Sequence, residues 1–170
     1  MFVGLASGAI FTIYKPLDPS IFSVGGVFLS FGLLIVAYNY DKLININRFR
    51  KIVFFVEIVM LLVVALYILL PYDYQTALLI YIGYQLTFMF GSYLLRAETI
   101  FVSKVEYLSR LDRYKQFGYL AGLVLSWVFY KVLSNIFSIT TNQTKIYILH
   151  FVLIFVEFFI LFFLFKSFKK

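Results

Sequence analysis

Long apolar runs, each bounded by charged residues or by a helix breaker, recur along the chain. A helix needs about 20 apolar residues to cross a hydrocarbon core of about 30 Å. Stretches such as residues 58–70 are apolar on every side, whereas the strands of membrane barrels alternate apolar and polar residues. The pattern therefore predicts five membrane-spanning helices, over residues 20–38, 52–70, 74–95, 116–133 and 145–165.

A further apolar run at the N-terminus, residues 1–14, is too short for a full span. At 1.5 Å per residue it reaches only about 21 Å. A secretory signal would have basic residues before its apolar region, but here Lys15 follows that region. We therefore expect an uncleaved, partial span.

The basic residues lie in alternate connections between the predicted spans. Connections on the cytoplasmic side of a membrane are enriched in Lys and Arg. The alternation predicts an integral membrane protein, which we expect in a bacterial cell (inner) membrane, with its C-terminus in the cytoplasm. The rich segments hold Lys42, Arg48, Arg50 and Lys51, then Arg96, Lys104, Arg110, Arg113 and Lys115, and finally Lys166, Lys169 and Lys170.

Composition supports a lipid environment and excludes several chemistries. The chain of 170 residues is 63% hydrophobic and 14% charged, against about 45–50% and about 25% in soluble domains. It has no cysteine and one histidine, so we expect no metal site and no cofactor. The net charge of +7 is spread over separate loops, which favours the lipid bilayer over nucleic acid as a partner. Since no catalytic motif occurs, we expect no enzyme activity.

The connection from Ala97 to Lys115 is mixed in character. Its apolar residues recur three or four positions apart among charged ones. This spacing predicts an amphipathic helix that lies on the cytoplasmic surface.

Two basic segments resemble those of the major facilitator superfamily of secondary transporters. The first has Ala37, Asp41-Lys42, Arg48, Arg50 and Lys51, and the second runs from Leu111-Asp112-Arg113 to Gly118. The resemblance implies one six-helix half of such a transporter. The expected fold is an all-α integral membrane bundle, a single domain over residues 1–170, with five full spans and a short N-terminal segment. The expected function is transport of a small-molecule solute by alternating access between two halves.

A lone half lacks one wall of the transport pathway, because substrate binds between repeats near the membrane midplane. A homodimer could complete the pathway, or another chain could supply the second membrane half. Two other functions stay open: a substrate-binding membrane subunit of an energy-coupling-factor transporter, and a non-transporting fragment or interaction protein.

Three ionisable residues lie inside predicted spans and are candidates for proton coupling: Glu57, His150 and Glu157. Burying such groups in lipid is costly, so they mark functional sites by default. His150 and Glu157 are seven positions apart, on one helix face and about 10 Å apart along the axis. The alternative is a protonated or hydrogen-bonded carboxyl between helices.

The resemblance also implies that the fourth and fifth helices of a six-helix count line the solute cavity. Polar and aromatic residues on one face of each are candidates for this lining, namely Tyr81, Gln85, Ser126 and Tyr130. The alternative is that these groups bond across helix contacts. Asp41, Arg96 and Arg113 resemble the charged cluster that forms a cytoplasmic gate in this family.

Overall fold

The computed structural model describes residues 6, 17–71 and 73–169, and within them the only regular secondary structure is α-helix. The helices are α2 (Pro19–Tyr38), the short α3 (Tyr40–Leu43), α4 (Ile46–Leu69), α5 (Tyr74–Phe101), α6 (Val105–Asn135) and α7 (Asn142–Ser167). All except α3 are long and apolar enough to cross a membrane. The predicted all-α polytopic bundle is thus confirmed. Apart from Ala6, the partial N-terminal span lies outside the described residues.

Local sequence signals set several helix ends. Asp18 caps α2 by accepting a hydrogen bond of 2.8 Å from the Ser20 amide, and Pro19 begins the helix. Hydrogen bonds from the Ser20 side chain and backbone lower the pKa of Asp18, so the cap stays charged at neutral pH. The helix α4 ends at Leu69, just before Pro71, whose ring disfavours helical geometry in the residue that precedes it.

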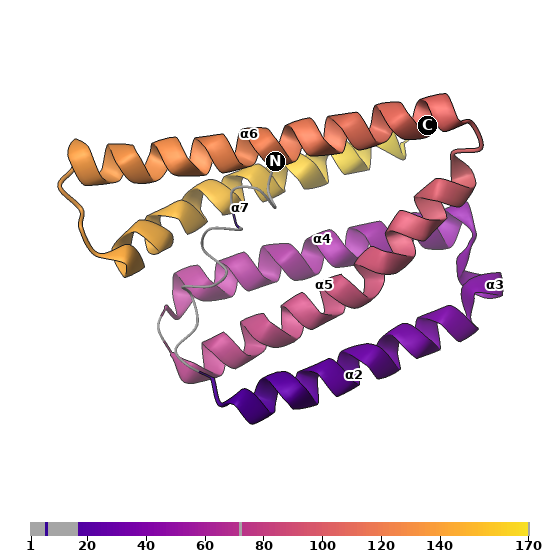
Figure 1. Ribbon diagram of the computed structural model, residues 1–170, viewed down its shortest axis with the longest axis horizontal. Coiled ribbons are helices and arrows are strands. Elements are labelled where there is room, and N and C mark those ends of the chain that lie inside the picture. Colours follow the sequence, from indigo (N-terminus) through magenta and orange to yellow (C-terminus); the bar gives the residue numbers. More distant parts are fainter. Residues whose placement is uncertain (1–5, 7–16, 72, 170) are drawn as a thin grey trace.

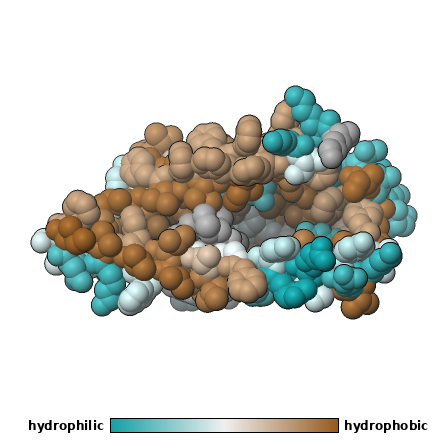
Figure 2. Space-filling view, turned by 90° about the horizontal axis from the view of Figure 1, so that it is seen from above, coloured by the Kyte–Doolittle hydropathy of each residue, from teal (hydrophilic) through white to brown (hydrophobic). Residues whose placement is uncertain are grey.

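Successive long helices run in opposite directions, so the basic-rich connections and the C-terminal end of α7 lie at one end of the bundle (Figure 1). The helix α4 packs against both α5 and α7, and α2 packs against α5. Hydrophilic residues gather toward the two ends of the long axis, with largely hydrophobic surface between them (Figure 2). This is the surface that a membrane-spanning bundle requires.

Two buried clusters hold the described helices together. The larger joins α4, α5 and α7 through Val63, Val64, Tyr67, Ile80, Ile146, Leu149 and Leu153, and it includes Ala6. The smaller joins α2 to the basic end of α5 through Val36, Tyr93 and Ala97. The first cluster lies toward the end opposite the basic connections, so the two clusters fix opposite ends of α5.

The predicted surface helix over residues 97–115 is wrong. The structure extends α5 to Phe101 and begins α6 at Val105, so the segment is divided between two helices. Val and Ser, which have low helix propensity, lie in the break at Val102, Ser103 and Lys104. An ion pair between Glu98 and Lys115 then joins the two helices across the turn.

Gly83 permits the close approach of α5 to α4. A Cβ atom at this position would overlap Cγ2 of Val63, whereas a Cβ at Gly91 on the same helix meets nothing within 4 Å. Gly83→Ala should therefore lower the thermal midpoint of the purified protein in detergent, at a cost of about 1–3 kcal/mol for overpacking. Gly91→Ala is the matched control, and it should leave the midpoint unchanged or raise it. Equal midpoints for the two variants would contradict the close α4–α5 contact.

Candidate functional site

The helices α4 and α7 run antiparallel with a register that four contacts define. At the basic end, an Arg50 guanidinium nitrogen donates to the Phe168 carbonyl at 3.2 Å. At the other end, the Tyr147 hydroxyl donates to the Ile68 carbonyl at 3.4 Å, and the rings of Tyr67 and His150 lie 4.0 Å apart. Residue numbers thus increase along α4 in the direction in which they decrease along α7. This register places Glu57 within about one helical turn of Glu157 across the contact.

The fourth contact is between these two acids. Glu57 is the twelfth residue of the 24-residue α4, and Glu157 is the sixteenth of the 26-residue α7, so both lie near the middle of their helices. Their side chains are close enough to interact across the contact between the two helices. Glu157 is fully buried, and neither of its oxygens receives a hydrogen bond. The structure therefore brings together the two acids that the sequence analysis identified as separate candidates.

His150, the third coupling candidate, does not join this pair directly. Its Nδ1 lies 2.8 Å from the Ile146 carbonyl one turn earlier on α7, and a hydrogen bond there requires a proton on Nδ1. In the neutral ring, Nε2 is then the acceptor. The ring is buried against Tyr67 of α4, about 10 Å along the helix axis from Glu157. His150 thus belongs to the α4–α7 contact, two turns from the acids.

The four predicted lining residues differ in their surroundings. The Tyr81 hydroxyl donates to the Phe22 carbonyl at 3.3 Å, so this side chain joins α5 to α2. Ser126 is buried on α6. Gln85 Oε1 and the Tyr130 hydroxyl are both buried and form no hydrogen bond of good geometry, although the Ser126 side chain lies near the Tyr130 hydroxyl. An unsatisfied buried polar group lowers the stability of the fold by about 1–3 kcal/mol. We therefore expect Gln85 and Tyr130 to lower the stability of the bundle.

The three predicted gate residues lie on three elements. Asp41 is exposed on α3, and the Arg96 guanidinium of α5 lies 5.7 Å from the centre of the neighbouring Tyr40 ring. Arg113 of α6 donates to the Ser109 carbonyl on its own helix at 3.4 Å. In the described part of the chain, these residues form no ion pair with one another.

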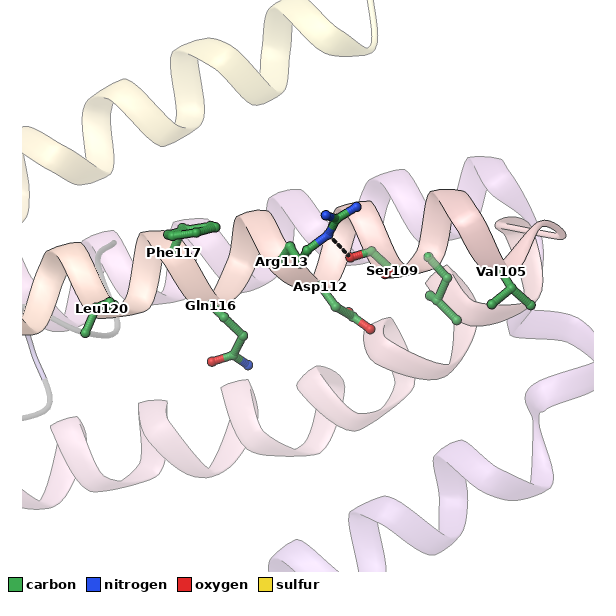
Figure 3. Close-up of a pocket in the computed structure, with 8 residues that line it drawn as sticks. Val105, Ser109, Asp112, Arg113, Gln116, Phe117 and Leu120 are labelled. Carbon is green, nitrogen blue, oxygen red and sulfur yellow. Dashed lines mark hydrogen bonds between the residues drawn. The ribbon is translucent and has the colours of Figure 1, made fainter.

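Arg113 also borders an open groove along the first half of α6. The groove has a volume of about 550 Å³, and its described lining comes from one face of α6. The side chains of Asp112 and Gln116 point from this face toward α5 (Figure 3). The remaining lining residues are Val105, Leu108, Ser109, Phe117 and Leu120.

A short sequence that contains each acid occurs twice in the chain. This match was missed when the acids were considered singly. Phe-Val-Glu occurs at residues 55–57 in α4 and again at residues 155–157 in α7. A second repeat links α2 to α6, where Gly26-Val-Phe-Leu-Ser-Phe31 matches Gly122-Leu-Val-Leu-Ser-Trp127 at four positions if the aromatic ends are counted as alike. In each case the matched helices run in opposite directions (Figure 1).

The chain was also compared with known proteins. No protein family, curated protein or solved structure matches it. Its function is therefore inferred from the geometry above and from the resemblance in the basic segments.

Tyr130 and Tyr93 provide a matched test of the unsatisfied hydroxyl. The Tyr93 hydroxyl donates to the Leu43 carbonyl at 2.7 Å, whereas that of Tyr130 lies near the Ser126 side chain without a hydrogen bond of good geometry. Tyr93→Phe should lower the stability by about 1 kcal/mol, and Tyr130→Phe should leave it unchanged or raise it. Thermal unfolding of both variants in one detergent measures this difference. A loss at Tyr130 as large as that at Tyr93 would show that the Tyr130 hydroxyl is bonded.

Proposed function

We propose that the chain is one half of a secondary transporter for a small solute, which works by alternating access with a second membrane half. The observation that carries this proposal is the pairing of Glu57 with Glu157, and we interpret the short sequence matches around the pair as an inverted repeat. Phe-Val-Glu recurs in α4 and α7, and the two copies meet near the middle of antiparallel helices. In many secondary transporters, repeats of inverted topology enclose the substrate and coupling-ion sites near the midplane.

The resemblance to the major facilitator superfamily is part of the same proposal. The order of spans and the two basic segments support it. A second copy of this chain or another six-helix chain supplies the missing half. The exposed faces of Gly26 and Ser30 on α2 offer small residues to such a partner, and small residues allow close helix packing in lipid.

Within this proposal, Gln85, Tyr130, Ser126 and Tyr81 line the solute pathway, and Asp41, Arg96 and Arg113 act at the cytoplasmic end. Support for the lining comes from the unsatisfied polar atoms of Gln85 and Tyr130. Their amide and phenol groups suit an uncharged or aromatic solute. The chain itself catalyses no reaction.

The proposed orientation places the basic end of the bundle in the cytoplasm. Because the chain has no cysteine, single cysteines can report on sidedness. Asn47→Cys, at the basic end, should resist a membrane-impermeant thiol reagent in intact cells and react after permeabilisation. Thr140→Cys, in the opposite connection, should react in intact cells. The reverse pattern would invert the orientation, and it would contradict the cytoplasmic position of the C-terminus.

Transport is tested in sealed lipid vesicles that contain only this chain. A panel of radiolabelled uncharged and aromatic solutes is offered under an imposed proton gradient. At least one solute should accumulate, and Glu157→Gln should reduce its uptake at least tenfold. Phe158→Leu, an exposed position next in sequence, is the matched control and should retain uptake.

The mass of the complex in mild detergent identifies the second half. Two copies per complex would support a homodimer, and co-purification of another membrane chain from the native host would support a split transporter. A monomer that accumulates no solute, and that purifies from its host without a partner, would contradict the proposed function.

A further inference from the structure

We propose that Glu57 and Glu157 form a proton-binding site in which the two carboxyl groups are held together by a shared proton. This deepens the proposed function by naming its coupling ion. The site itself stands on geometry and does not depend on transport. Its use as a coupling site rests on the proposed function.

A proton is required by the chemistry of the contact. Two ionised carboxylates offer only acceptors, so neither can donate a hydrogen bond to the other. They nevertheless approach each other closely enough to interact, one from each side of the α4–α7 contact. Both oxygens of Glu157 are buried without a donor. A proton on one carboxyl makes it a donor and converts a repulsive contact into a hydrogen bond.

Among the described residues, neither acid belongs to an ion pair. The ion pairs in the described part of the chain, Glu106 with Arg110 and Glu98 with Lys115, do not involve either acid. Burying an unpaired carboxylate in an apolar interior is far costlier than burying a neutral acid. The other described titratable side chains of the adjacent core are His150 of α7, Tyr67 of α4, Tyr84 of α5, Tyr130 of α6 and Tyr147 of α7.

The donor set suits a proton better than a metal cation. Two carboxylates converge here, and the described residues contain no group of three or more His, Cys, Asp or Glu that could hold a metal. Calcium and magnesium take six or more oxygen ligands. A proton needs only the two oxygens that share it.

Infrared spectroscopy of the purified chain in lipid vesicles at pH 7 tests the site directly. Exposed carboxyls titrate near pH 4 and are ionised at neutral pH. The wild type should retain a carbonyl band of a protonated, hydrogen-bonded carboxyl. The double variant Glu57→Gln and Glu157→Gln, which preserves side-chain size, should lose the band. Glu106→Gln, at an exposed acid, is the matched control and should leave the band unchanged.

A third variant tests whether the two acids share the proton. Glu57→Leu removes the partner of Glu157 and leaves an apolar side chain, so the remaining band should move to the higher frequency of a carboxyl without a hydrogen bond. The proposal is overturned if the wild type shows no band of a protonated carboxyl at pH 7, or if Glu57→Leu leaves the frequency of that band unchanged. It is also overturned if the band disappears when sodium replaces potassium in the buffer, because the site would then bind sodium. Since the signal needs no solute flux, a failure of transport alone would leave this result intact.

Discussion

A polar group inside a bilayer must find its partners within the protein, and the α4–α7 contact is where this chain meets that constraint with two acids. Hydrogen bonds and aromatic contacts at both ends of the contact hold the two helices in register. The Arg50–Phe168 and Tyr147–Ile68 bonds are far apart along the helices, so the acids between them have little freedom to separate. A register shift of one residue would turn Glu157 out of the buried face. The position of the acids therefore depends on the packing of the whole contact.

The proposed inverted repeat would explain why the acids meet, because antiparallel helices that carry the same short sequence near their centres bring equivalent residues together. The surroundings of the other two matched helices differ. Gly122 and Ser126 are buried on α6, but the matching Gly26 and Ser30 are exposed on α2. The matching small residues are thus packed within the chain on α6 and exposed on α2.

The sequence predicted the five membrane helices well, because span length and hydropathy are local properties that the bilayer imposes directly. It erred between Ala97 and Lys115, where apolar spacing alone cannot distinguish one surface helix from the ends of two helices. It identified Glu57 and Glu157 as candidates because burying an acid in lipid is costly. It did not predict their contact, which joins positions 100 residues apart. Only the Phe-Val-Glu repeat could have paired them. The unsatisfied atoms of Gln85 and Tyr130 depend on tertiary packing and have no signature in sequence.

The two directions that lead away from the acid pair along α4 and α7 differ in chemistry. Toward the basic end, Phe54 and Phe168 lie together, and the Arg50 guanidinium lies 5.9 Å and 5.5 Å from their ring centres. Aromatic rings and a fixed positive charge disfavour the passage of a proton. In the opposite direction, the contact contains the phenol of Tyr67 and the imidazole of His150, both of which can exchange protons. Within this buried contact, the described side chains that can exchange protons thus lie on the side of the pair away from the basic end.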